Sequence, residues 1–206
     1  TAVNTRSAAR EFWHEMLAGA TAVSPDFVDL AEHRVQQAEL RLCDDELERL
    51  QMAAKRCRVS LESLLFAAFS MVLSGYCEDS PDELVIACAS RGRPTHAYND
   101  TVGMFVHTLP VRVVIRPDAT LQENVRTIVE VLRNAIEHEG LPLSEIAQLH
   151  HGDVGELLEV MFTARHKEVP LEMGGMIAEP QVRYASELDC GILLDSVLSS
   201  HECLLV

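Results

Sequence analysis

The chain has 206 residues and a mass of 22.8 kDa, the size of one ordinary domain or of one large lobe of a bigger domain. Its 17 basic and 32 acidic side chains give a formal net charge of −15, which disfavours a nucleic-acid or membrane-surface partner because phosphate backbones and anionic headgroups are repelled. With 48% hydrophobic and 24% charged residues, the composition excludes a disordered chain and predicts a globular one.

The first residues and the cysteines indicate the compartment. Residues 1–6 contain neither a signal-peptide pattern nor an initiator methionine, and no apolar run approaches the ~20 residues of a membrane span. The six cysteines include no C-x-x-C pair, which predicts reduced thiols and no metal site. We therefore expect a cytoplasmic protein, and an excised piece of a longer polypeptide.

The first helix is expected over residues 7–17, where apolar side chains recur at spacings of three and four. Trp13 lies on this apolar stripe and is expected to anchor the packing of the helix. The periodicity is lost over residues 21–37, which contain Pro25 and scattered acids. That segment predicts an extended crossing of the domain.

Two more helices follow. Asp44 and Asp45 are placed to cap an amphipathic helix that runs to about residue 58. Ser60 is placed to cap the next helix, which is apolar on nearly every side and stops at Gly75. We expect this helix to be buried in the middle of the domain.

A short, β-branched apolar run over residues 84–89 predicts an interior strand. Residues 90–101 are polar and predict a flexible loop. The segment 102–116 alternates well at its end, with Val111 and Val113 on one face. Pro110 lacks an N–H group, so we expect it to interrupt the ladder or to lie at an edge or bulge.

Thr120 and Glu123 form a capping box that opens an amphipathic helix to about residue 136. A short helix through Leu149 and a loop over residues 150–155 are expected next. Strands are then predicted over residues 157–163, 177–184, 188–197 and 201–206. The pattern predicts a two-layer α/β (α+β) sandwich with a mixed sheet covered by helices.

No residue pattern indicates a complete active site. His150 and His151 could in principle bind a metal or act as a base, but adjacent histidines converge poorly on one ion and no third ligand lies at helical spacing, so a solvated loop is favoured. The G-x-S-x-G nucleophile string and the G-x-x-x-x-G-K phosphate loop are both absent.

Four isolated side chains have both a structural and a functional interpretation. Arg91 and Arg93 could meet an anionic ligand, although pairing with one of the many acids is favoured. His107 lies in a mostly apolar strand, where a hydrogen-bonded core or edge histidine is favoured over a catalyst. Asp189 is a carboxylate in a predicted strand and is expected to pair with an arginine or with backbone N–H groups. The residues alone therefore indicate an acidic α/β domain.

A longer motif resembles the condensation domains of nonribosomal peptide synthetases. The string Gly92-Arg93-Pro94 precedes TVGMFVHTLPVR at residues 101–112, and the family has a G-R motif followed by a stretch like V-G-M-F-V-N-T-L-P-L-R. The W-x-x-x-L helix, the E-H-x-x-x-P segment and the V-M-F and D-L strands of the family are matched in the same order, at residues 13–17, 137–142, 160–162 and 188–189. The resemblance covers most of residues 7–198.

The resemblance implies a chloramphenicol-acetyltransferase-like pair of lobes with a tunnel between them. Phosphopantetheine arms of two carrier proteins enter from opposite faces, and the acceptor amine attacks the donor thioester to form an amide. The family's H-H-x-x-x-D-G motif lies in the N-terminal lobe; here His150 and His151 are followed by Gly155 and Glu156 where the motif needs an aspartate and a glycine. The implied assignment of residues 1–206 is the C-terminal lobe alone, with no catalytic residue, no directly bound cofactor and no activity without its partner lobe.

The resemblance also implies roles for individual residues. It assigns tunnel and motif positions to Arg93, Gly103, Met104, Phe105, His107, Thr108 and Asp189. We expect carrier docking at Arg91, Arg93 and Arg112. The family's usual asparagine is His107 here, which exchanges a neutral amide for an ionisable imidazole. Two alternatives remain open: a catalytically silent module that recruits a carrier or a partner enzyme, and a related domain for epimerisation, cyclisation or ester formation.

Overall fold

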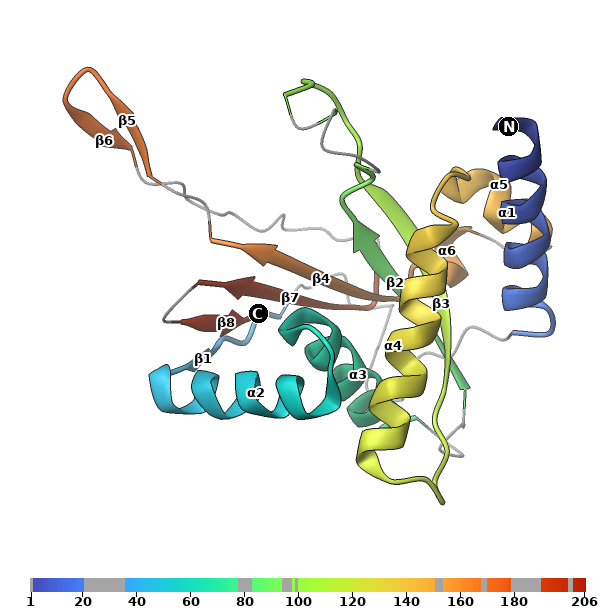
Figure 1. The fold of residues 1–206 in the computed structure, drawn as a ribbon, viewed down its shortest axis with the longest axis horizontal. Helices are drawn as coiled ribbons and strands as arrows, with labels where there is room; N and C mark the ends of the chain where they lie inside the picture. The colour runs from blue at the N-terminus through green and yellow to red at the C-terminus, as the bar shows by residue number, and fades with distance from the viewer. Residues whose placement is uncertain are drawn as a thin grey trace.

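The structure is a computed structural model that describes residues 2–20, 36–77, 83–93, 98, 100–150, 154–167, 170–178, 190–199 and 202–206. A six-stranded mixed sheet runs through the molecule in the order β1-β8-β7-β4-β2-β3, with helices packed against it (Figure 1). Its strands are β1 (Leu40–Leu42), β2 (Glu83–Ser90), β3 (His107–Val114), β4 (Val160–His166), β7 (Ile192–Leu198) and β8 (Cys203–Leu205). The predicted α/β sandwich with a mixed sheet is confirmed.

The helices are α1 (Ala2–Leu17), α2 (Asp44–Cys57), α3 (Leu61–Ser74), α4 (Leu121–Glu137), α5 (Leu143–His150) and α6 (Val154–Leu157). A separate hairpin of β5 (Leu171–Met173) and β6 (Met176–Ala178) extends away from the sheet (Figure 1). Within the described residues no single helix is long and apolar enough to cross a bilayer; α2 and α3 meet that test only as a pair, and a bend of 91° separates them.

The parallel strands β2, β4 and β7 form the middle of the sheet, and antiparallel pairs complete both sides. Strand β3 is an edge strand, so Pro110 removes no ladder hydrogen bond on its free side, as predicted. The strand begins at His107 and not at residue 102. The reason is the register: β2 ends at Ser90, directly opposite His107, so the residues before His107 have no strand beside them.

Helix starts follow local hydrogen bonding. Ser60 caps α3 by accepting the N–H of Ser63 at 3.1 Å, and Thr120 and Glu123 form the predicted capping box of α4. The cap of α2 is Cys43, because its N–H binds the Glu46 carboxylate at 3.0 Å. The predicted capping residues of α2 instead lie in its first turn, where negative side chains favour the positive end of the helix dipole.

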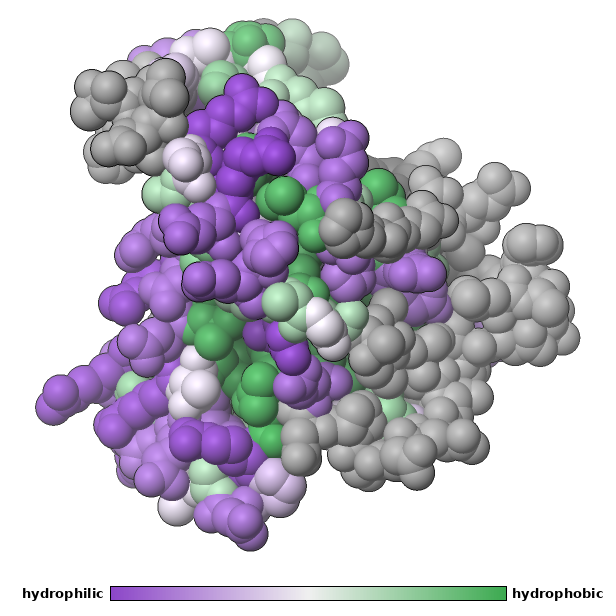
Figure 2. Space-filling model, turned by 90° about the vertical axis from the view of Figure 1, so that its right-hand side faces the viewer, coloured by the Kyte–Doolittle hydropathy of each residue, from purple (hydrophilic) through white to green (hydrophobic). Residues whose placement is uncertain are grey.

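The core lies between the sheet and the helices. Trp13, Phe66, Ile86, Ile128 and Phe162 are almost fully buried, and these residues come from elements throughout the chain. The indole N–H of Trp13 donates to the carbonyl oxygen of His138 at 2.9 Å, which confirms the tryptophan as the anchor of α1. Figure 2 shows that the side of the molecule at the right of Figure 1 presents mainly hydrophilic side chains, with a narrower central band of apolar ones.

Several element boundaries differ from expectation. Helix α1 begins at Ala2, five residues before the predicted start. The expected loop at 150–155 is interrupted by α6, so β4 begins at Val160 and not at residue 157. Helix α3 is buried on one side only, since Val72 is 57% exposed. Strands β1 and β5 were not predicted, and the expected crossing segment at 21–37 lies mostly outside the described residues.

Candidate functional site

The connection between β2 and β3 begins with a glycine that no other residue could replace without strain. Gly92 has φ +59° and is buried, and a Cβ atom there would overlap the carbonyl oxygen of Phe105 and lie 2.5 Å from Cδ2 of His107. Only a residue without a side chain allows the two backbone segments to approach this closely. Gly92 therefore fixes the two ends of the connection against each other.

The next residue organises the connection itself. The guanidinium of Arg93 lies over the Phe105 ring, 4.2 Å from its centre, and donates hydrogen bonds to the carbonyl oxygens of Tyr98 and Thr101, the latter at 3.1 Å. The rings of Tyr98 and Phe105 are 5.9 Å apart. An arginine that stacks on a ring and binds two carbonyls uses both its planar face and its fork of N–H groups.

His107 is the first residue of β3, and its cross-strand neighbour is Ser90. Side chains of directly opposed residues in an antiparallel pair lie on one face of the sheet. The Ser90 hydroxyl donates to the carboxylate of Glu139, in the turn after α4. The fold thus brings Ser90, His107 and Glu139 to the same end of the sheet.

Sequence reasoning singled out His107 but neither Ser90 nor Glu139. Ser90 is only the polar residue that ends an apolar strand, and Glu139 is one of many surface-type acids. No local spacing links them, because they are 49 positions apart and meet only through packing of α4 on the sheet.

The remaining predicted motif residues divide between the loop and the strand. Gly103 and Met104 lie in the exposed part of the connection, and the Met104 side chain is 94% exposed. Thr108 is half-buried in β3, on the face opposite to that of His107. Asp189 lies outside the described residues.

The three arginines expected at a docking surface have different environments. Nε of Arg112 is 2.7 Å from Oε2 of Glu83, and Nη1 of Arg112 donates to the carbonyl oxygen of Ala18 at 2.7 Å, so this residue ties β3 to β2 and to the end of α1. Arg93 is occupied within the connection, as described above. Arg91 is exposed and has no ion pair with any residue that the structure describes.

The other candidates have structural surroundings. His150 ends α5 and is not in a loop; its Nδ1 lies 3.2 Å from the carbonyl oxygen of Leu17, while His151 lies outside the described residues. Burial raises the pKa of the Cys88 thiol to about 12, so it is not a thiolate at neutral pH. In the described part of the chain, no three His, Cys, Asp or Glu side chains are grouped as metal ligands.

Exposed apolar side chains gather on two projections. The β2–β3 connection carries Val102 at 100%, Met104 at 94% and Val106 at 59% exposure, and the β5–β6 hairpin exposes Met173, Met176 and Ile177. Both segments extend beyond the body of the sheet (Figure 1). Apolar side chains grouped in this way are typical of a surface that another polypeptide covers.

The sequence of this chain matches a known protein family. Residues 2–173 match the family described as Condensation domain. A linear gramicidin synthase chain of Brevibacillus parabrevis is 30% identical over 149 residues, which are 68% of this chain and 2% of that protein.

Solved structures share the fold. The X-domain from teicoplanin biosynthesis, solved in complex with OxyB, has a TM-score of 0.78 at 20% identity, covering 98% of this chain and 47% of that one. The starter condensation domain of rhizomide synthetase, in complex with C8-CoA and Leu-SNAC, has a TM-score of 0.77 at 16% identity, covering 98% and 46%. The chain therefore spans a small part of the curated relative and just under half of the solved chains.

Proposed function

Because this chain belongs to the condensation domain family, we propose that it is the C-terminal lobe of a condensation domain in a nonribosomal peptide synthetase. Such a domain forms an amide bond between a donor and an acceptor that carrier proteins hold as phosphopantetheine thioesters. The observation that carries the proposal is the coverage: nearly the whole chain superimposes on just under half of a starter condensation domain. The proposed compartment is the cytoplasm, where exposed thiols such as Cys43 stay reduced.

The proposed reaction is an acyl transfer. The acceptor's amine nitrogen attacks the carbonyl carbon of the donor thioester, a C–N bond forms, the C–S bond breaks, and the thiol leaves on the donor's phosphopantetheine arm. The amine must also lose a proton to a base. We assign that base to the partner lobe, since the 206 residues contain no H-H-x-x-x-D-G string.

In this proposal the chain supplies tunnel wall and carrier-docking surface. Arg93 and Phe105 keep the β2–β3 connection in one shape, and His107 stands at its base beside Gly92. The connection and the β5–β6 hairpin would pack on the N-terminal lobe through their exposed apolar side chains. Arg91 would meet a carrier protein directly; Arg93 would contribute by holding the adjoining connection, and Arg112, which lies opposite Val85 and binds Glu83, would contribute from farther along β3.

Reconstitution tests the proposal. The chain is mixed with an N-terminal lobe that contains the histidine motif, and amide formation from loaded donor and acceptor carriers is followed by mass spectrometry. Product is expected from the mixture and not from either lobe alone. Product from this chain alone, or no product from a folded two-lobe complex, would overturn it.

The packing surface is tested by a matched pair of variants. Met104→Asp places a charge on the β2–β3 connection and is expected to weaken association of the lobes by at least about tenfold. Leu121→Asp is the control, because Leu121 is 69% exposed at the start of α4, away from both projections. Equal effects of the two changes would contradict this placement of the interface.

A second candidate function is recruitment without catalysis. It is favoured by one observation, the fold shared with an X-domain that was solved in complex with OxyB. A degraded histidine motif in the upstream gene segment and a two-lobe complex that binds another enzyme but forms no amide would support it. Epimerisation, cyclisation or ester formation would appear as a different product in the same assay.

A further inference from the structure

The turn after α4 is held from the side of α1. The carbonyl oxygen of His138 accepts the Trp13 indole N–H at 2.9 Å, and the His138 ring stacks on Phe12 with the ring centres 4.1 Å apart. Nδ1 of His138 also lies 2.8 Å from the carbonyl oxygen of Asn134, in the last turn of α4. The next residue, Glu139, therefore starts from a backbone that is fixed against the body of the fold.

Glu139 reaches from this turn to the end of β2. Its carboxylate accepts a hydrogen bond from the Ser90 hydroxyl, and both side chains are half-buried. Among the residues that the structure describes, no Lys, Arg or His nitrogen lies within 4.0 Å of this carboxylate. A hydroxyl binds a carboxylate more strongly than it binds a neutral acceptor. The bond to Ser90 is therefore the contact through which Glu139 acts on the sheet.

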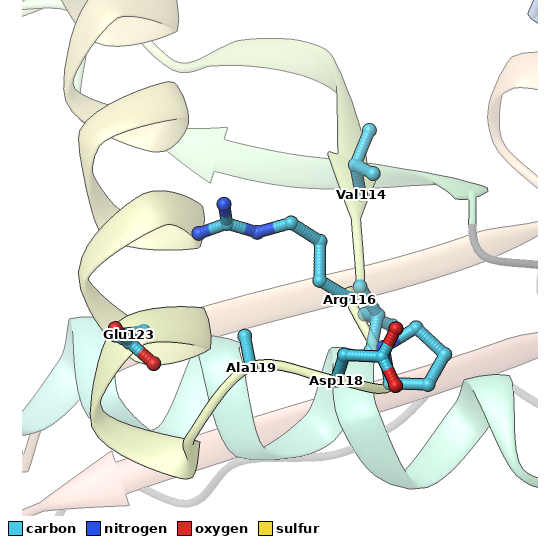
Figure 3. Close-up of a pocket in the computed structure, with 7 residues that line it drawn as sticks. Val114, Arg116, Asp118, Ala119 and Glu123 are labelled. Carbon is cyan, nitrogen blue, oxygen red and sulfur yellow. The ribbon is translucent and has the colours of Figure 1, made fainter.

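Helix α4 is attached to both ends of the β2–β3 strand pair. At its start, the Asn124 side chain accepts the backbone N–H of Arg116 at 3.0 Å and donates to the Arg116 carbonyl oxygen at 2.9 Å, just after the end of β3. Figure 3 shows this end, where Arg116 and Glu123 line a surface depression. In the turn after the helix, Glu139 binds Ser90 at the opposite end of the pair. Glu139 is therefore the attachment on the side of the β2–β3 connection.

Ser90 lies where the two ends of the β2–β3 connection meet. It is directly opposite His107, the first residue of β3, so their Cβ atoms are about 5 Å apart on one face of the sheet. Arg91 and Gly92 follow Ser90 in the chain, and a Cβ atom on Gly92 would lie 2.5 Å from Cδ2 of His107. The imidazole thus contacts the start of the connection at Gly92 and has Ser90 as its cross-strand neighbour. A displaced Ser90 would shift the two ends of the connection relative to each other.

We propose that Glu139 is a positioning residue for the amide-forming reaction, acting through Ser90 on the base of the β2–β3 connection. The inference rests on the proposed function, in which Arg91 meets a carrier protein and the connection forms tunnel wall. Glu139 supplies no reacting group in this scheme, because the base is assigned to the partner lobe. Loss of its hydrogen bond should therefore weaken carrier binding, which raises KM, and leave kcat nearly unchanged.

Amide-formation kinetics of the two-lobe complex test the proposal. Glu139→Ala and Ser90→Ala each remove one partner of the hydrogen bond, whereas Glu139→Gln keeps an oxygen that accepts it. We expect both alanine variants to raise the KM for a loaded carrier at least about fivefold with kcat within about twofold, and Glu139→Gln to restore most of the affinity. Glu137→Ala is the control, since Glu137 is 62% exposed at the end of the same helix.

A second readout needs no catalysis. The ring proton on Cδ2 of His107 lies close to the α-protons of Gly92, so NMR of the chain should show a nuclear Overhauser effect between them. The effect should weaken in Glu139→Ala and Ser90→Ala and persist in Glu139→Gln and Glu137→Ala. Circular dichroism establishes that each variant is folded.

The outcomes separate this inference from the proposed function. In a complex that forms amide, an unchanged KM in both alanine variants would overturn the inference and leave the proposed function intact. A fall of kcat in parallel with kcat/KM would place Glu139 in the chemistry instead. Equal effects of Glu137→Ala would mean that only the charge at this end of α4 matters. If the complex forms no amide, the proposed function fails, and the Overhauser effect alone decides whether Glu139 positions the connection.

Discussion

The guanidinium of Arg93 lies 4.2 Å from the centre of the Phe105 ring, although the two residues are 12 positions apart in the sequence. The same guanidinium binds the carbonyl oxygens of Tyr98 and Thr101. One side chain therefore holds three points of the β2–β3 connection. Arg93 therefore links Tyr98, Thr101 and Phe105, three of the described residues of the connection.

Arg93→Lys is expected to loosen the connection while preserving its charge. A lysine cannot stack a planar group on Phe105 and bind two carbonyls in a fork at once. The Thr101 N–H, which donates to the Tyr98 carbonyl oxygen at 3.1 Å, should exchange with solvent at least about tenfold faster, measured by amide hydrogen exchange. Arg91→Lys is the control. Unchanged exchange in Arg93→Lys would show that the arginine does not hold this turn.

Gly92→Ala is expected to destabilise the fold by about 3 kcal/mol or more, because the new Cβ would overlap the Phe105 backbone and the residue would keep a positive φ. Gly140→Ala is the matched control, since a Cβ there meets nothing within 4 Å, and it should change stability by less than about 1 kcal/mol. Urea unfolding followed by circular dichroism measures both. Similar midpoints for the two variants would contradict the close approach.

What the sequence predicted correctly depends on local signals. The capping box of Thr120 and Glu123 lies within four residues and is followed by an amphipathic period, so α4 was found with its start. Strand β2 was found because residues 84–88 are buried on both faces and residues 84–89 are all apolar. The α2 cap was misplaced because Cys43 is not a usual residue type at that position, and its backbone N–H and thiol donate to the Glu46 carboxylate.

Long-range pairing produced the features that were not predicted. Strand β1 has three residues and exists because it pairs with β8 at the far end of the chain. The Arg112–Glu83 ion pair depends on the register between β2 and β3, which local sequence patterns do not predict. For the site, the resemblance located Gly92, Arg93, Phe105 and His107, but their mutual contacts and the Ser90–Glu139 hydrogen bond required the fold.

The two capping boxes predict acid sensitivity. Hydrogen bonds from Thr120 lower the pKa of Glu123, and those from Cys43 lower the pKa of Glu46. A folded-state pKa below the unfolded value of 4.5 gives stability that is complete above that value and is lost as pH falls through the folded pKa. Urea unfolding between neutral pH and about pH 3 measures this loss.

Glu46→Gln/Glu123→Gln should therefore lose less stability on acidification than the unmodified chain, because glutamine keeps the capping geometry without titrating. Glu48→Gln, on the same helix as Glu46, serves as the control. An unchanged acid profile in the double variant would show that these two carboxylates do not contribute to the pH dependence.

Asp195→Asn is expected to destabilise the fold by about 1.5–3 kcal/mol, because a neutral amide replaces the carboxylate in the charge-assisted hydrogen bonds with Arg165 and Thr163. Asp195 is 3% exposed; its Oδ2 lies 2.9 Å from Nη2 of Arg165, and its Oδ1 accepts the Thr163 hydroxyl at 2.6 Å. Asp45→Asn, at an exposed carboxylate, should cost less than about 1 kcal/mol. Thermal and urea unfolding of the double variant Asp195→Leu/Arg165→Met complete a double-mutant cycle for this ion pair. The matching single variants are Asp195→Leu and Arg165→Met. If the charge pair itself is the cause, the double variant is more stable than the sum of these two single changes predicts; a double variant as unstable as that sum would place the cause in packing instead.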